Sequence, residues 1–415
     1  MNKKAQYHLA VLKYLYLTQG LPVSELSRRL HKSLSFTTDI LTELKDRKFV
    51  AENGYAESSG GRRPVIYSLC KNMLYIVAVA MDQFITRIVI FDEHNHPVCE
   101  TEKIDLPLAN NPDALSTLSF EIEKTISSAK IDTTKILGVG IAMPGLVDTV
   151  KGINYSFLPN AEKSIAAFLS QKLKLPVFID NDSSLIALAE QRFGMMKAID
   201  NALVVNIGWG VGLGVIVNGQ LIRGNNGFAG EFSHIPLFLN GKLCSCGKTG
   251  CLETETSLPA IIEKVNAGLN EKIPSSLKGK LDASTLNWEM DIDNIIHAAQ
   301  RGDSLALDVL SEAGYNIGRG LSVLIHIFNP KLIVLSGRGA LAGNLWKAPI
   351  HHSMYKYTIA RIAQDVEIAI SELGYNAELI GAATLVTERT GKKEYEEFLK
   401  KSRVHEAAEL INAVN

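Results

Sequence analysis

The sequence predicts an α/β protein in which a small helical domain precedes a body of two α/β lobes. Two patterns support this fold class: helical spacing and glycine-marked extended pieces in residues 1–70, and β-rich runs alternating with helical stretches afterwards. The 415 residues leave room for two or three cores. Charge divides at the same place, because residues 1–70 hold 11 Lys and Arg against 6 Asp and Glu, and the rest 32 against 38. A basic segment of this kind favours a polyanionic partner.

Residues 1–70 are predicted to form a winged helix-turn-helix domain. Apolar spacing predicts helices over residues 4–18, 24–30 and 35–47, with breaks at Gly20, at Pro22 and in the stretch 31–33. On the third helix, apolar residues face a small core and polar ones are left for a DNA groove. The predicted core residues are Phe36, Ile40, Leu41 and Leu44, and the predicted DNA-facing residues are Ser35, Thr37, Thr38, Thr42 and Lys45.

A β-wing is predicted after this helix. Asn53-Gly54 and Gly60-Gly61 are expected to form turns between extended pieces. Arg62 and Arg63 then lie where a wing touches phosphate or the minor groove. The alternative is a helical docking module with a solvated basic face, but the order helix, turn, helix, wing favours DNA.

The two lobes are predicted from alternating strands and helices. The first spans residues 71–200 and is completed by 375–415, and the second spans residues 201–374. Strands are expected within 75–98, 136–148, 176–182, 201–224 and 331–337, and helices over about 113–129, 258–269, 292–301 and 304–328. Residues 392–415 are expected to form a helix that closes the first lobe or joins a subunit contact, with a charged solvated tail as the alternative.

One imidazole and three thiols lie within eighteen residues: His234, Cys244, Cys246 and Cys251. This donor set suits tetrahedral Zn²⁺, and four protein ligands leave no open position, so we expect one structural zinc ion per chain. Ordinary buried or redox thiols are the alternative, but the neighbouring glycines and lysines argue against burial.

The sequence shows neither a membrane span nor a signal peptide. The N-terminal apolar stretch is interrupted by Lys13 and tyrosines and lacks a small-residue cleavage site, so it is interpreted as a helix. Clustered metal-binding cysteines fit a reducing compartment. We expect a cytoplasmic protein with no membrane partner.

The stretch from Gly227 to Glu253 resembles the signature of the ROK family, which contains repressors, open reading frames and sugar kinases. The likeness includes Glu-x-x-His at 231–234, the run C-x-C-G-x-x-G-C-x-E at 244–253 and a glycine loop at 206–214. Ser233 stands where the family usually has glycine. Because the ending GGRRPVIYSL resembles the wing of ROK repressors, the chain is most similar to winged-helix repressors of the N-acetylglucosamine and xylose type. The resemblance implies a two-lobed actin-like ATPase fold over residues 74–390.

The resemblance also implies a sugar site. Carboxylates accept hydrogen bonds from sugar hydroxyls, an amide both donates and accepts, and a histidine can bind zinc through one nitrogen while the other faces the sugar. For any one of these residues the alternative is a capped turn or a surface polar group. The implied residues are Asn160, Asn181, Asp182, Glu231, His234 and Glu253, with Gly145 near them. Asp182 matches the general base of the kinases.

The phosphate loops depart from those of the family's kinases. In the first loop, an Asp-x-Gly-x-Thr pattern, Ala80 replaces the aspartate and Asp82 replaces the glycine. A carboxylate there repels a triphosphate and blocks close backbone approach. In the second, Trp209 stands between two glycines in place of a small hydroxyl residue, and residues 336–341 are a third departure. We therefore expect no catalytic residue and no enzyme activity.

Together these features predict a sugar-responsive DNA-binding regulator. It is expected to be a homodimeric or homotetrameric repressor, released from operator DNA by a sugar or sugar phosphate. An ATP-dependent sugar kinase with an added DNA-binding domain is one alternative, and a repressor controlled by a protein partner is another. The sequence leaves the sugar open among N-acetylglucosamine, glucose, xylose and related ligands.

Overall fold

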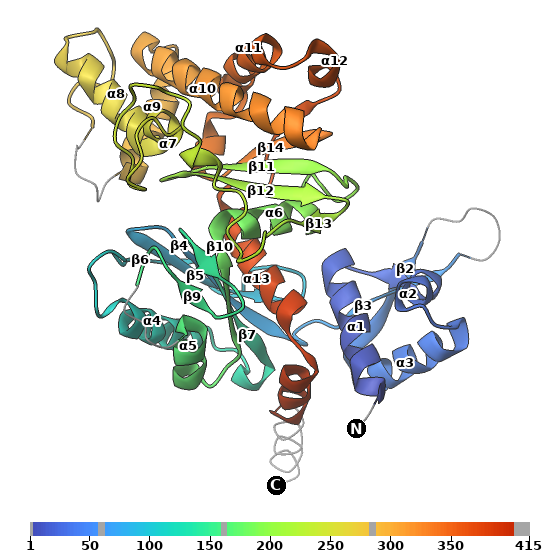
Figure 1. Ribbon diagram of the computed structural model, residues 1–415. Coiled ribbons are helices and arrows are strands. Elements are labelled where there is room, and N and C mark those ends of the chain that lie inside the picture. Colours follow the sequence, from blue (N-terminus) through green and yellow to red (C-terminus); the bar gives the residue numbers. More distant parts are fainter. Residues whose placement is uncertain (1–2, 57–62, 159–163, 282–287, 402–415) are drawn as a thin grey trace. The chain divides into compact units, whose positions relative to one another are not determined.

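The computed structural model describes residues 3–56, 63–158, 164–281 and 288–401 (Figure 1). Contacts divide the chain into two units. The first combines residues 1–81, 85–180 and 379–415, and the second combines 82–84 with 181–378. The predicted boundary near residue 200 therefore differs from the structure, which assigns α6 (Asp182–Arg192) to the second unit.

The N-terminal part of the first unit has the predicted order of elements. Its helices are α1 (Lys3–Thr18), α2 (Val23–Leu30) and α3 (Leu34–Asp46), and its strands β1 (Leu21–Pro22), β2 (Val50–Tyr55) and β3 (Val65–Leu69) form a sheet in the order β1-β3-β2. The helices match the prediction to within one residue at every end. Leu26, Ile40 and Leu44 are fully buried between them. The Ser33 hydroxyl accepts a hydrogen bond from the Phe36 amide (3.2 Å), which starts α3 directly after a short turn.

Two predictions for α3 are corrected. Thr37, expected to face DNA, is completely buried, and its hydroxyl donates to the Ser33 carbonyl (3.0 Å). Residues three and four apart share a helix face, so Thr37 lies on the same face as Ile40 and Leu41. Phe36, expected in the core, is only half-buried and meets Tyr7 edge-on, with 5.0 Å between the ring centroids.

The wing also differs from its prediction at one end. Asn53 and Gly54 do not form a turn but belong to β2, where the pairing with β3 shifts between Glu52 and Tyr55. The positive φ of Gly54 (80°) fits such an irregularity. The second expected turn, at Gly60-Gly61, lies outside the described residues.

The rest of the first unit is a sheet covered on both faces. The strands β4 (Tyr75–Met81), β5 (Ile85–Asp92), β6 (Glu102–Asp105), β7 (Ile136–Met143) and β10 (Val177–Asn181) run in the order β10-β7-β4-β5-β6, beside a short hairpin of β8 (Val147–Asp148) and β9 (Ile153–Asn154). The helices are α4 (Ala114–Ser128), α5 (Ile165–Leu173) and α13 (Ala377–Arg389), with a 3-10 turn η1 (Thr133–Lys135).

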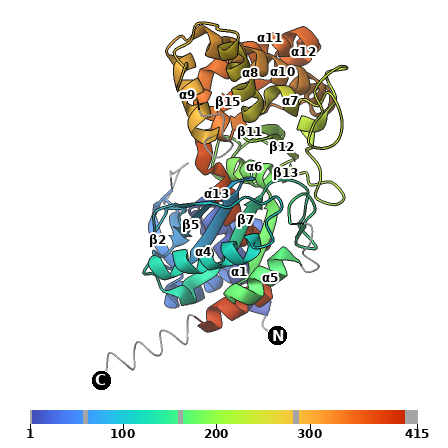
Figure 2. The same ribbon diagram turned by 90° about the vertical axis from the view of Figure 1, so that its left-hand side faces the viewer.

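Successive residues of β7 point to opposite faces of the sheet, and different helices cover those two faces. Val139 and Ile141 belong to the core under α4 and α5, which lie side by side in Figures 1 and 2. Gly138 and Gly140 face α13 instead. A Cβ atom at Gly140 would come within 1.9 Å of the Ala382 carbonyl oxygen, so only glycine allows this close helix packing.

The predicted C-terminal helix closes the first unit. Residues 392–401 are helical, and Tyr395 and Phe398 are buried. The segment is therefore a helix with buried aromatic side chains as far as residue 401, and residues 402–415 lie outside the described range.

The second unit has a five-stranded sheet in the order β13-β12-β11-β14-β15. The strands are β11 (Ala202–Ile207), β12 (Val211–Val217), β13 (Gln220–Leu221), β14 (Leu332–Ser336) and β15 (Glu367–Ile370). The α-helices besides α6 are α7 (Glu253–Thr256), α8 (Leu258–Asn270), α9 (Trp288–Gln300), α10 (Ser304–Phe328), α11 (Lys347–Tyr357) and α12 (Ala360–Ala363), and the 3-10 segments are η2 (Phe232–His234), η4 (Arg338–Trp346) and η5 (Gly374–Asn376).

The glycine loop of residues 206–214 joins β11 to β12, and its glycines also allow a helix to pack closely against β12. A Cβ atom at Gly212 would lie 1.8 Å from the Ser183 hydroxyl oxygen, and one at Gly214 would lie 2.2 Å from the Ala187 Cβ. Both glycines therefore let α6 approach β12 closely, which positions the start of α6.

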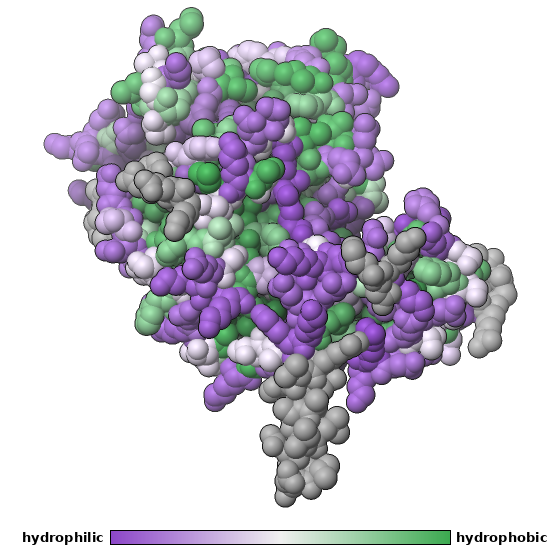
Figure 3. Space-filling view, turned by 60° about the horizontal axis from the view of Figure 1, so that its bottom comes forward, coloured by the Kyte–Doolittle hydropathy of each residue, from purple (hydrophilic) through white to green (hydrophobic). Residues whose placement is uncertain are grey.

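Hydrophilic and apolar residues are interspersed over the face of the molecule shown in Figure 3. Within the described parts of the chain, no helix is both long and apolar enough to cross a bilayer.

Candidate metal centre and ligand site

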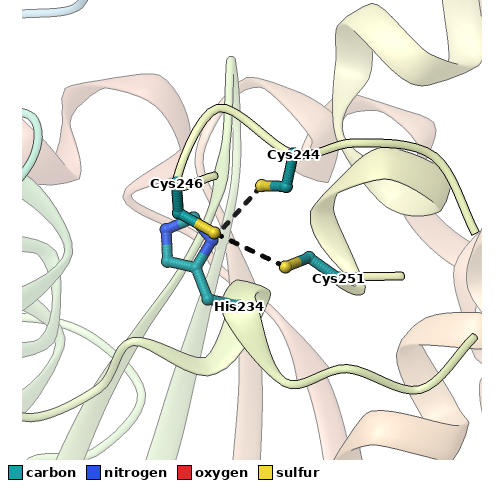
Figure 4. Close-up of side chains that lie close together, drawn as sticks. All are labelled: His234, Cys244, Cys246 and Cys251. Carbon is teal, nitrogen blue, oxygen red and sulfur yellow. Dashed lines mark hydrogen bonds between the residues drawn. The ribbon is translucent and has the colours of Figure 1, made fainter. Parts of the chain in front are cut away.

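Four side chains of the second unit converge on one point. The ligand atoms of His234, Cys244, Cys246 and Cys251 all lie within 4.8 Å of one another (Figure 4). The Cys244 sulfur is 3.5 Å from Nδ1 of His234, and the Cys246 and Cys251 sulfurs are 3.6 Å apart. The sequence prediction of a four-residue cluster is confirmed, and its geometry suits a single metal ion.

The cluster forms because the chain folds back on itself between η2 and α7. Isolated bridges pair Pro236 with Cys251 and Leu243 with Thr249. Gly250 has a positive φ of 78°, and a Cβ there would meet the Phe238 carbonyl oxygen at 1.9 Å. A glycine is thus required immediately before the last cysteine.

Two of the three thiols are buried, although the sequence predicted that their glycine and lysine neighbours would keep them exposed. Cys246 is exposed, but Cys244 and Cys251 are buried despite their polar neighbours. Burial raises the pKa of Cys251 to about 12, and the adjacent thiols add to the shift. A bound cation acts in the opposite direction, since it stabilises the thiolate form.

His234 lies between the cysteine cluster and a carboxylate. Its Nδ1 faces Cys244, while its Nε2 is 3.7 Å from the Glu231 carboxylate. Partial removal of its carboxylate from solvent raises the pKa of Glu231, although the side chain is still 42% exposed; the charge of Glu253 adds to this, and His234 opposes it. The two ring nitrogens of His234 therefore have different neighbours, a cysteine sulfur and a carboxylate.

Glu253 begins α7 and is held by two hydroxyl groups. Ser233 donates to one carboxylate oxygen (3.1 Å) and Ser245 to the other (3.3 Å). The glycine loop passes beside it, because a Cβ atom at Gly210 would lie 3.1 Å from the Glu253 carboxylate. Sequence reasoning missed the role of Ser233 and Ser245, although the unusual serine at 233 was a visible signal.

Asp182 and Asn181 lie at the junction of β10 and α6. The Asn181 side chain caps α6, accepting from the Ser183 and Ser184 amides (3.0 and 3.1 Å). Asp182 accepts from the Ser183 amide (2.7 Å) and, through its other oxygen, from the Asn206 side-chain amide (3.3 Å). Asn206 is a further polar residue that the prediction left out, although it begins the glycine loop.

The protonation of Asp182 is strongly perturbed. Burial raises the pKa of this carboxyl to about 6, and hydrogen bonds from Ser183 oppose the shift. The negative charges of Glu231 and Asp82 raise it further. Perturbed carboxyls of this kind gather at functional sites.

Asn160 and Gly145 were also predicted to lie near the ligand. Asn160 lies outside the described residues. Gly145 has a positive φ of 83°, and a Cβ atom there would lie 2.5 Å from the Ser156 side chain, so a tight turn explains this glycine.

Aromatic side chains fill the region of the two altered loops. Trp209 packs edge-on against Phe84, with ring centroids 4.5 Å apart, and against Trp288 at 5.5 Å. Asp82 accepts a hydrogen bond from the Phe84 amide (2.7 Å) and so closes its own turn. Ala80 is buried within β4.

The third altered loop, residues 336–341, holds an ion-pair network. Arg338 donates to Glu289 (3.0 Å) and Asp293 (2.6 Å), and its guanidinium lies 5.1 Å from the centroid of the Tyr375 ring. Tyr375 in turn donates to Glu289 (2.6 Å). These groups are paired with one another in the free protein.

The remaining predicted DNA-facing residues lie at the surface of the N-terminal domain. Ser35, Thr38, Thr42, Lys45 and Arg63 are exposed, whereas Arg62 lies outside the described residues. Thr38 and Thr42 each donate to a carbonyl four residues earlier in α3 (2.9 Å), and Lys45 pairs with Glu52 of β2.

Comparison with known proteins identifies relatives along nearly the whole chain. The ROK family profile matches residues 81–389. The xylose repressor of Caldicellulosiruptor bescii is 27% identical over 390 residues, which cover 91% of this chain and 94% of the repressor.

Solved structures give the same picture. A ROK family transcriptional regulator described as a homolog of the E. coli MLC protein has 27% identity and a TM-score of 0.77, covering 96% of this chain and 98% of its own. A ROK family glucokinase from Streptomyces griseus, in complex with glucose and AMPPNP, has 28% identity and a TM-score of 0.65. It covers 75% of this chain but 98% of its own length, so a quarter of this chain has no counterpart in the kinase.

Proposed function

The chain belongs to the ROK family, and on that premise we propose that it is a sugar-responsive transcriptional repressor that binds operator DNA. One observation carries the proposal: the similarity to xylose repressors and to the MLC-like regulator extends over more than 90% of the chain. The glucokinase likeness covers only 75%. The additional length accommodates the N-terminal domain.

The proposed DNA-binding surface is the exposed face of α3 together with the wing. Ser35, Thr38 and Thr42 offer hydroxyl groups to base edges or phosphates, and Lys45 and Arg63 offer positive charge. The pairing of Lys45 with Glu52 leaves the ammonium group available for exchange to a phosphate, because exposed ion pairs contribute little stability. Helix-turn-helix proteins read two half-sites, so we propose that the repressor acts as a homodimer or homotetramer.

The proposed sugar site is formed in the second unit by Asn181, Asp182, Glu231, His234 and Glu253. Their carboxylate oxygens and Nε2 of His234 provide the acceptors and the donor that a polyhydroxylated ligand requires. Glu231 is exposed, which suits a residue that meets the ligand.

The proposed metal is one structural zinc ion. Four ligands about 2.3 Å from a tetrahedral zinc lie about 3.8 Å from each other. The observed separations of 3.5 and 3.6 Å are close to this value. His234, Cys244, Cys246 and Cys251 would hold the ion, which would tie the loop together and fix the His234 ring; Nε2 of that ring lies 3.7 Å from Glu231.

We propose that the body has no kinase activity. A triphosphate would have to displace Trp209 from its contacts with Phe84 and Trp288, and would meet the charge of Asp82. The Arg338 network supports the same conclusion, since this cation is already paired with two carboxylates.

Contacts within the first unit support coupling between ligand and DNA. Lys13 of α1 donates to the Glu388 carbonyl in the last turn of α13 (2.8 Å), where a cation also interacts favourably with the helix dipole. The buried Tyr16 donates to Asn95. Because α13 begins at Ala377, at the boundary in the sequence between the two units, we propose that this helix links ligand binding to the DNA-binding domain.

A sugar panel tests this function. Thermal shift should detect one ligand among D-xylose, D-glucose, N-acetyl-D-glucosamine and the hexose 6-phosphates, because a ligand that binds the folded state raises its melting temperature. The stabilisation should disappear in Glu231→Gln. Absence of any shift across the panel, with retained operator binding, would favour control by a protein partner.

A further inference from the structure

Ser233 is a buried hydroxyl group placed directly on the Glu253 carboxylate. It lies in η2, is only 5% exposed, and its oxygen is 3.1 Å from one carboxylate oxygen of Glu253. Ser245 binds the other carboxylate oxygen at 3.3 Å. Each oxygen of Glu253 therefore accepts one serine hydroxyl, and Ser233 is the better buried of the two donors.

The surroundings of Glu253 make these donors important. The Cys244 sulfur lies 3.6 Å from the Glu253 oxygen that Ser245 also contacts. The other Glu253 oxygen accepts a hydrogen bond from Ser233. Ser233 therefore acts on the oxygen that Ser245 and Cys244 do not contact.

We propose that Ser233 is a positioning residue that orients Glu253 for a hydrogen bond with a sugar hydroxyl. The inference rests on the proposed sugar site. A carboxylate offers about four lone-pair sites, two on each oxygen. Ser245 and the Cys244 sulfur lie against one oxygen of Glu253, and Ser233 donates to the other, so Ser233 sets the direction in which the remaining acceptor site of that oxygen faces a sugar hydroxyl. A glycine at position 233 has no hydroxyl group, so the Glu253 oxygen that Ser233 now contacts would lose this hydrogen bond.

The test is calorimetric titration of the zinc-loaded protein with the sugar panel named above. Ser233→Ala removes the hydroxyl but keeps the Cβ, so it should weaken sugar binding roughly tenfold, the usual effect of one hydrogen bond to a charged group. Ser233→Gly should lose about as much. Ser322→Ala is the matched control, because Ser322 is equally buried and donates to the Arg319 carbonyl instead.

A double-mutant cycle tests whether the effect passes through Glu253. In a Glu253→Ala background, Ser233→Ala should change sugar affinity by less than about twofold. Zinc content and melting temperature measured beside each titration show that the variants are folded and metal-loaded.

Three results would overturn the inference. Wild-type affinity in Ser233→Ala would show that the hydroxyl is irrelevant, and the proposed function would stand. An equal loss with and without Glu253 would show that Ser233 acts elsewhere. Failure of the wild type to bind any sugar of the panel would remove the proposed function and this inference with it.

Discussion

Replacing Asp182 by asparagine should stabilise the free protein at alkaline pH. Burial and negative neighbours raise the pKa of Asp182 from its ordinary 3.8 to about 6, so the charged form is unfavourable in the folded state. A shift of roughly two units corresponds to about 3 kcal/mol. Asparagine has nearly the same shape and carries no charge, so it should recover most of this free energy.

The sign of the pH dependence follows from linkage. Because the folded-state pKa is raised, the destabilisation is fully present above pH 6 and is lost as pH falls toward 3.8. The advantage of Asp182→Asn should be greatest at pH 8, on the order of 5 °C in melting temperature, and about half as large at pH 5. Scanning fluorimetry without sugar measures it, with Asp365→Asn, an exposed carboxylate, as the control. A pH-independent difference, or a less stable Asp182→Asn at pH 8, would refute the reasoning.

The other predictions concern metal, catalysis and DNA. Protein purified without chelator should contain about one zinc ion per chain, and the Cys246→Ala/Cys251→Ala double variant should contain none; full retention of zinc in that variant would contradict the assigned ligands. Coupled assays with ATP, Mg²⁺ and the sugar panel should stay at background, and turnover abolished by Asp182→Ala would instead establish a kinase. Replacing Arg62 and Arg63 with alanine should flatten the log-log salt dependence of operator binding by up to about two units, as measured by anisotropy, while sugar affinity stays unchanged.

Elements with strong periodicity or fixed spacing were predictable from the sequence. The bounds of α10 (Ser304–Phe328) match the expected helix, because a long apolar stripe and an Asp303 N-cap define it locally. The metal-ligand set was predictable too. His234 and the three cysteines lie within eighteen residues, so a short folded loop brings them together.

Contacts that depend on tertiary packing were not predictable. The phase of α3 around its axis decides that Thr37 is buried, and composition alone does not fix that phase. Burial of Cys251 depends on its bridge to Pro236, and the contact of Ser233 with Glu253 joins residues twenty positions apart. Gly212 looks like part of a phosphate loop, yet in the structure its missing side chain makes room for α6.

Operator binding with and without sugar tests the central claim most directly. The probe is a labelled DNA fragment obtained by in vitro selection with the wild-type protein, and the readout is fluorescence anisotropy. A saturating concentration of the sugar identified by thermal shift should weaken wild-type operator binding at least fivefold, while Glu231→Gln should bind DNA normally and not respond. If the sugar binds the wild type but leaves its operator affinity unchanged, the protein is not a sugar-released repressor.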